Sequence, residues 1–121
     1  MPVVGVGLDL LDISRMEDKI GSSIFMDKVF TKAEQAYISG RGKFTAASAA
    51  GIFCAKEAFV KAVGEGLSIP LREIEVCRDE RGKPFLTLHG STGDQFSELE
   101  INLSITHTDT TAAAVVVLSK A

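Results

Sequence analysis

Hydrophobic and polar positions alternate in the first segment of the chain, from Val3 to Leu11. The even positions carry aliphatic side chains: Val4, Val6, Leu8 and Leu10. A period of two predicts a β-strand, and we expect the even-numbered face to lie in the core. The other face holds Gly5, Gly7 and Asp9, where another backbone or a ligand can approach closely.

Two short helices are expected next. Asp12 or Ser14 can cap a helix that runs through Lys19. Thr31 is followed three residues later by Glu34, which is the pattern of a capping box at the start of a second helix.

The longest helical pattern covers residues 45–63 and is rich in alanine, with Gly64 placed to end it. It is apolar nearly all round, which is typical of a buried helix. Lys56, Glu57 and Lys61 are its charged residues, and we place them in one sector of its surface.

Four further strands follow this helix. The segments 74–77 and 85–88 flank a hairpin loop over 79–84, residues 101–106 alternate, and 112–118 is an apolar run. Because no alternation of strands and helices appears in this half, the predicted class is α+β. We expect a small antiparallel sheet packed on a long, mostly buried central helix.

Composition narrows the possible classes of protein. The chain has 121 residues, 45% of them hydrophobic, so residues 1–121 are expected to form one domain. Its formal net charge of -3 shows no basic excess of the kind that a nucleic-acid binder carries. No apolar run approaches the ~20 residues that span a bilayer, and no signal-type segment is present, so a cytoplasmic protein is predicted. Cys54 and Cys77 are far apart, which favours neither a zinc site nor a disulfide framework.

Glu57 and Lys61 have two interpretations. They can form a surface ion pair at i,i+4 spacing, worth a few tenths of a kcal/mol. They can instead lie near the core, where charges need partners or a metal. Residues 41–64 carry four basic side chains and only one acidic one, Glu57, in a chain of net charge -3. That balance favours a site for phosphate and metal.

Asp9 also has two interpretations, a residue of a strand-end turn or a metal ligand. With Glu57 it offers two carboxylates, and magnesium commonly uses one or two carboxylates with phosphates and waters.

His107 ends a strand between two threonines and can be structural or contact a phosphate. No nucleophile elbow, phosphate-binding Walker loop or zinc-protease motif is present.

Together these segments resemble one family, the holo-acyl-carrier-protein synthases, which are 4'-phosphopantetheinyl transferases. The matching runs follow in order along nearly the whole chain: Gly5-Val6-Gly7-Leu8-Asp9 with Arg15, residues 28–34, residues 53–66 with Lys-Glu-Ala-x-x-Lys-Ala and Gly-x-Gly, Gly82-Lys83-Pro84, and Ser104-Ile105-Thr106-His107.

The resemblance implies transfer of the 4'-phosphopantetheine arm from coenzyme A to a serine of apo acyl carrier protein, with release of 3',5'-ADP, in support of fatty acid biosynthesis. It implies Mg²⁺ bound by Asp9 and Glu57, with Lys61 on the pyrophosphate of coenzyme A, and these three as the catalytic residues. The nucleophile belongs to the carrier protein, which fits the absence of a nucleophile motif here.

The resemblance also assigns the nucleotide contacts. Thr106 and His107 are implied near the adenosine 3'-phosphate, and Lys83 and Pro84, after Gly82, near the adenine. Relatives of this size form homotrimers with sites between subunits, so the same is expected here.

The carrier is expected to be acidic and to dock on basic residues such as Arg15 and Lys19. One departure concerns Ile52, since many family members have arginine at this position. Arg41 or Lys43 would have to supply that contact, or it is absent.

Two rival functions remain at this stage. One is a magnesium-dependent phosphodiesterase that uses Asp9 and Glu57 on another phosphoester. The other is a non-catalytic oligomeric binding module that retains the fold.

Overall fold

The computed structural model describes residues 2–64 and 68–120. Glu65 and Gly66 of the Gly-x-Gly motif lie outside them. The elements, in chain order, are β1 (Val3–Asp12), α1 (Ile13–Glu17), α2 (Ser23–Val29), α3 (Lys32–Ser39), the 3-10 turn η1 (Gly42–Phe44), α4 (Thr45–Val63), η2 (Leu71–Glu73), β2 (Ile74–Arg78), β3 (Pro84–Leu88), α5 (Gly90–Gln95), β4 (Leu99–His107) and β5 (Thr111–Lys120).

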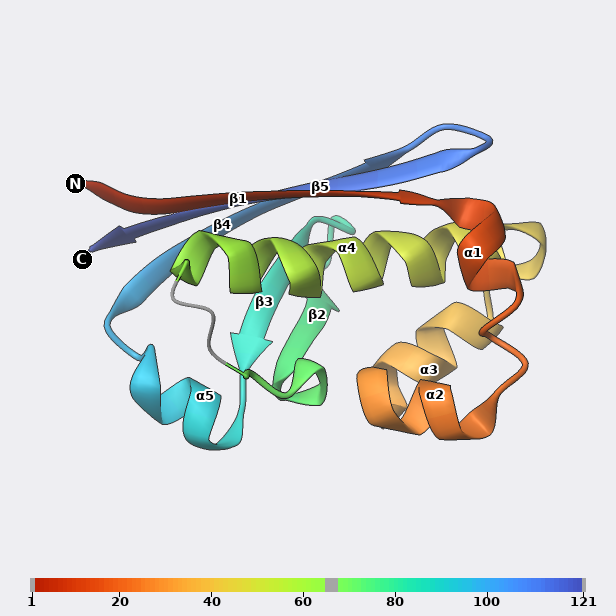
Figure 1. Cartoon of the computed structure of the whole chain (residues 1–121), viewed down its shortest axis with the longest axis horizontal. Coiled ribbons are helices and arrows are strands. Elements are labelled where there is room, and N and C mark those ends of the chain that lie inside the picture. The colour runs from red at the N-terminus through yellow and green to blue at the C-terminus, as the bar shows by residue number, and fades with distance from the viewer. Residues whose placement is uncertain (1, 65–67, 121) are drawn as a thin grey trace.

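The strands form two antiparallel sheets around the central helix. One has the order β1-β5-β4, and the other is the β2–β3 hairpin. Figure 1 shows α4 running along the three-stranded sheet, with the hairpin and the helices α2, α3 and α5 on its other side. The predicted α+β class, with a small antiparallel sheet on a long central helix, is confirmed. No helix among the described residues is long and apolar enough to cross a membrane.

Helix α4 forms the centre of the core and has the predicted bounds. Within this helix only Lys61 is exposed, while Cys54 and Phe59 are fully buried. Gly64 ends it in the left-handed conformation, at φ 76°. An alanine-rich helix can be covered on nearly all sides because its small side chains let neighbouring elements approach.

The prediction for the two faces of β1 was wrong. Its even-numbered aliphatic residues point away from α4 and are 49–69% exposed: Val4, Val6, Leu8 and Leu10. Gly5 and Gly7 face α4 instead, and a Cβ on either would overlap a backbone carbonyl oxygen of the helix. Glycine is required there because the strand lies against helix backbone.

The short helices differ in part from expectation. The capping box of Thr31 and Glu34 is confirmed at the start of α3. Helix α1 is shorter than predicted and ends at Glu17, and Asp12 is at its N-cap position without a side-chain cap bond. Helices α2 and α5 were not predicted, since both are too short to show a helical period.

Lys56 does not belong to the charged sector in which it was placed. Its ammonium is fully buried on another side of α4 and lies 2.8 Å from Glu34 Oε1, also fully buried. It also donates hydrogen bonds to the carbonyl oxygens of Leu71 and Ile74. Burial lowers the pKa of Lys56, and the charge of Glu34 opposes that shift. The basic excess expected around Glu57 is therefore smaller than the sequence indicates.

Candidate active site

Asp9 and Lys61 meet at the seam between β1 and α4. Asp9 pairs with the buried Ala114 of β5, so its side chain lies on the face of the sheet that α4 covers. Lys61 Nζ lies 2.8 Å from Asp9 Oδ1 and donates to the carbonyl oxygen of Leu8 at 3.1 Å. The i,i+4 ion pair of Lys61 with Glu57 is not formed, because the lysine turns to the strand.

Glu57 lies close enough to Asp9 and Lys61 for their charges to shift its pKa. Burial raises the pKa of Glu57, the negative charge of Asp9 raises it further, and Lys61 partly opposes these effects. The hydrogen bond to Asp9 raises the pKa of Lys61. Beside them, burial and then Asp9 raise the pKa of the Cys54 thiol to about 12, which keeps it unreactive. The structure thus brings two carboxylates and one ammonium together.

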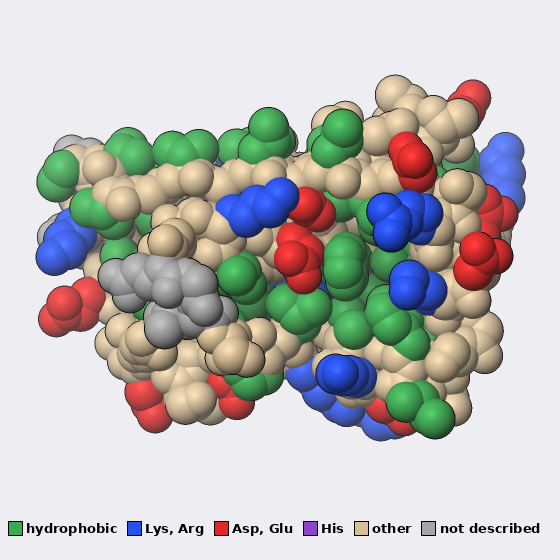
Figure 2. Space-filling model, in the orientation of Figure 1, with side chains coloured by type: hydrophobic (Ala, Val, Ile, Leu, Met, Phe, Trp, Pro, Cys, Tyr) green, Lys and Arg blue, Asp and Glu red, His purple; other side chains and the backbone are tan. Residues whose placement is uncertain are grey.

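These carboxylates line a cleft of about 380 Å³. Its walls come from the end of β1, from α1 and from the middle of α4, and they include Asp9, Arg15, Lys19, Phe53 and Glu57. Acidic and basic side chains stand close together along this seam in Figure 2. Carboxylates beside cations in a concave surface suit a metal-assisted reaction at a phosphate.

The donor set fits magnesium. The described residues contain no group of three or more metal-ligating side chains, so Asp9 and Glu57 are what this cleft offers. Magnesium commonly takes one or two carboxylates and completes its shell with waters and substrate phosphates.

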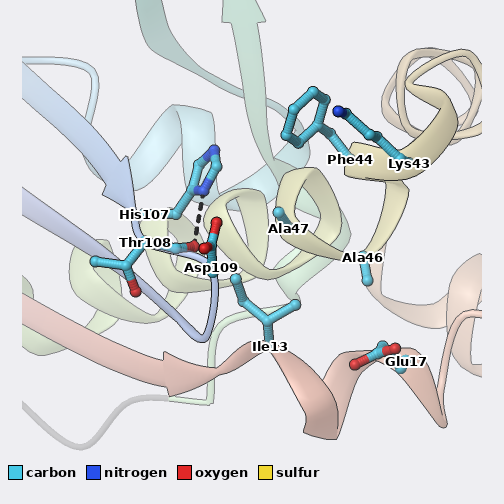
Figure 3. A pocket seen from close by; sticks show the side chains of 9 residues that line it. All are labelled: Ile13, Glu17, Lys43, Phe44, Ala46, Ala47, His107, Thr108 and Asp109. Atoms are coloured by element: carbon cyan, nitrogen blue, oxygen red, sulfur yellow. Dashed lines mark hydrogen bonds between the residues drawn. The ribbon is translucent and has the colours of Figure 1, made fainter.

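His107 lies in a second cleft, of about 320 Å³, which also contains Lys43, Phe44 and Asp109. Figure 3 shows the η1 side chains and His107 approaching the same space from different segments. The ring centroids of Phe44 and His107 are 6.3 Å apart. Phe44 was not predicted, because nothing in the sequence links it to a residue so distant along the chain. Thr106 lies on the opposite face of β4 from His107, since alternate residues of a strand point to opposite faces.

Lys83 and Pro84 belong to a third cleft, of about 230 Å³, between the β2–β3 hairpin and β4. His107 and Asp9 are separated by two strand spacings and two residues, or roughly 10 Å across and 7 Å along the sheet. The predicted site residues that line these clefts are therefore divided among three of them in one chain, and Lys61 and Thr106 line none of the three. No single one of these clefts holds them all.

Comparisons with known proteins identify the family of this chain. The family model described as the 4'-phosphopantetheinyl transferase superfamily matches residues 5–116. A holo-(acyl-carrier-protein) synthase of Treponema denticola is 40% identical over 96% of this chain and 98% of its own. The chain belongs to the 4'-phosphopantetheinyl transferase superfamily.

Solved structures give the same result. The crystal structure of a holo-(acyl-carrier-protein) synthase from Bacillus anthracis in complex with CoA (3',5'-ADP) has a TM-score of 0.84 and 35% identity, covering 98% of each chain. The synthase of Helicobacter pylori in complex with coenzyme A has a TM-score of 0.82 and 27% identity, covering 94% of this chain and 99% of its own.

Proposed function

We propose that this chain is a holo-acyl-carrier-protein synthase. It transfers 4'-phosphopantetheine from coenzyme A to a serine of apo acyl carrier protein, releases 3',5'-ADP, and so serves fatty acid biosynthesis in the cytoplasm. Residues 1–121 act as one transferase domain. The observation that carries the proposal is the meeting of Asp9 and Glu57 in one cleft, with Lys61 paired to Asp9 beside it, in a chain that belongs to this superfamily.

Asp9 and Glu57 are the residues that would hold Mg²⁺. The metal supplies positive charge that offsets charge on the pyrophosphate oxygens during transfer. The side chain of Lys61 is 54% exposed, so its ammonium can turn from Asp9 to the pyrophosphate. The chain thus contributes positioning and electrostatic stabilisation.

The reacting hydroxyl comes from the carrier protein. Its oxygen forms a bond to the β-phosphorus of coenzyme A, and the bond from that phosphorus to the 3',5'-ADP leaving group breaks. The serine proton must pass to a base, which completes the transfer.

Coenzyme A extends from this cleft to a neighbouring subunit in our proposal. Thr106 and His107 bind the 3'-phosphate, and Lys83 and Pro84 bind the adenine. His107, Lys83 and Pro84 line other clefts than the carboxylates, which supports a site that a second copy completes. The exposed aliphatic face of β1 supports a homotrimer, since a patch of this kind is typical of an interface. Figure 2 shows hydrophobic side chains along the edge that β1 forms.

The apo carrier docks beside the same cleft. Arg15 and Lys19 line it and are exposed, and Lys19 Nζ lies 5.2 Å from the centroid of the Phe25 ring. Basic side chains around the cleft attract an acidic partner, with a dependence on salt.

Release of 3',5'-ADP tests the proposal against the rival functions. A transferase releases 3',5'-ADP from coenzyme A only when apo carrier protein is present. A phosphodiesterase would release it without the carrier, and a binding module would retain coenzyme A without turnover. Either of these two outcomes contradicts the proposal.

A further inference from the structure

Tyr37 of α3 holds two arginine side chains against its ring. The Cζ of Arg41 lies 5.2 Å from the ring centroid, and the Cζ of Arg78 lies 4.8 Å from it. Arg41 comes just before the η1 turn, whereas Arg78 is the last residue of β2. The ring therefore joins α3 to two segments that are far apart in the sequence.

Arg78 connects Tyr37 to the β2–β3 hairpin loop. Its guanidinium donates to the carbonyl oxygen of Gly82 at 3.2 Å. Hydrogen bonds within the loop stabilise its shape, because the Asp79 carboxylate accepts them from the backbone N–H groups of Arg81 and Lys83 at 2.8 and 2.9 Å. The shape of the loop is thus set locally, and its position relative to α3 depends on Arg78.

Arg41 connects Tyr37 to the η1 turn. The Arg41 carbonyl oxygen accepts a hydrogen bond from the Phe44 backbone N–H at 3.1 Å, and its Nε donates to Ser48 Oγ at 3.4 Å. Lys43 and Phe44 of this turn line the cleft that contains His107. The stack therefore links the two clefts that lie away from the carboxylates.

Neither guanidinium is neutralised by an acid. In residues 2–64 and 68–120 no carboxylate oxygen lies within 4.0 Å of Arg41 or Arg78. An arginine stacked on an aromatic face is held without loss of its charge. Both segments are therefore held in place by groups that remain available to attract an anion.

We infer that Tyr37 is a positioning residue for the nucleotide end of coenzyme A. Through Arg41 and Arg78 it fixes the turn with Lys43 and the hairpin with Lys83 at one separation, so that the 3'-phosphate and the adenine of one nucleotide meet both at once. This inference rests on the proposed function, in which the hairpin binds the adenine and His107, whose cleft the η1 turn lines, binds the 3'-phosphate.

Calorimetric binding of 3',5'-ADP, without carrier protein, tests it. Tyr37→Leu removes the ring face and should raise the Kd for 3',5'-ADP about tenfold, as expected for two exposed cation–π contacts, whereas Tyr37→Phe should restore wild-type binding. In turnover, Tyr37→Leu should raise the KM for coenzyme A and leave kcat and the KM for the carrier within about twofold. A purely structural role would lower kcat as well.

Arg78→Gln and Arg81→Gln form a matched pair in the same hairpin. Both remove one positive charge, but only Arg78 contacts the ring. We expect weaker 3',5'-ADP binding for Arg78→Gln than for Arg81→Gln, and this pair decides the matter if Tyr37→Leu does not fold. Equal binding by the pair, or wild-type binding by Tyr37→Leu, overturns the inference. A wild-type protein that neither binds 3',5'-ADP nor transfers phosphopantetheine would instead refute the proposed function.

Discussion

Gly7 of β1 lies directly against the backbone of α4 at Ala58, and a methyl group added to Gly7 would overlap the Ala58 carbonyl oxygen. Gly5 meets Ala62 in the same way, one helical turn further along. With no side chain between them, strand and helix lie in backbone contact. This contact carries Asp9, two residues beyond Gly7, to the seam where the carboxylates gather.

Gly7→Ala should therefore separate the strand from the helix. Backbone atoms of the helix cannot yield as a flexible side chain can, so we expect a loss of about 1–3 kcal/mol in the free energy of unfolding, together with reduced transferase activity. Gly21→Ala is the control, because a Cβ there meets nothing within 4 Å. Urea denaturation measures both, and equal stability of the two variants would refute the close contact.

Lys56→Met should be strongly destabilising. It leaves the fully buried carboxylate of Glu34 without its partner, which costs about 3–5 kcal/mol in comparable cases. Adding Glu34→Gln removes the unpaired charge and should recover part of the loss in urea denaturation. Losses that simply add would show that the two side chains do not interact.

Glu75 should contribute a pH-dependent part of the stability. The hydrogen bond from Thr31 and the contact with His89 lower the pKa of Glu75 in the folded chain. A depressed folded pKa gives stability above the unfolded pKa of the carboxyl, and that stability is lost as pH falls through the folded pKa. Glu75→Gln should therefore lower the unfolding free energy by about 1–2 kcal/mol at pH 7.

The difference between Glu75→Gln and wild type should disappear in acid, below the ordinary range of a glutamate. Thermal unfolding from pH 7 to pH 3 measures this, with the exposed Glu100→Gln as the control. A difference that stays constant with pH would mean that Glu75 acts by packing alone.

Leu8→Asp should break the assembly. Leu8 is 63% exposed on the aliphatic face of β1, and a buried unpaired charge at an interface is costly. Light scattering should show a trimer for the wild type and a smaller, inactive species for Leu8→Asp. Ile24→Asp, at a position that is 81% exposed on α2, is the control and should stay trimeric. A fully active wild-type monomer would contradict the shared site.

The sequence predicts the elements of this fold better than it predicts their faces. The alanine-rich apolar segment of α4 and the alternation of β1 and β4 mark those elements correctly. Alternation in β1 defines two faces but cannot say which one meets the helix, and here small glycines mark the covered face. The aliphatic residues opposite are left for a partner, which a single sequence does not display.

For the candidate site too, the sequence predicts the elements better than the contacts between them. Asp9 and Lys61 meet because the glycine-bearing face of β1 packs against α4, whereas the alternation of β1 was interpreted with its aliphatic face in the core. Lys56 was misplaced although helix geometry of ~100° per residue sets it about 100° from Glu57 and about 140° from Lys61. Its partner, Glu34, comes from α3, and no local pattern reveals a contact between residues so far apart. Phe44 beside His107 was missed for the same reason.

The most direct test is the intact mass of apo carrier protein after incubation with coenzyme A, magnesium and either wild type, Asp9→Asn or Glu57→Gln. The wild type should add one phosphopantetheine per carrier, and each folded variant should be slower by on the order of a hundredfold, because the charge that holds the metal is lost. The double variant should be little slower than either single one, since both carboxylates serve one ion. An unmodified carrier with the wild type, or near-wild-type rates for both single variants at limiting magnesium, would contradict the account.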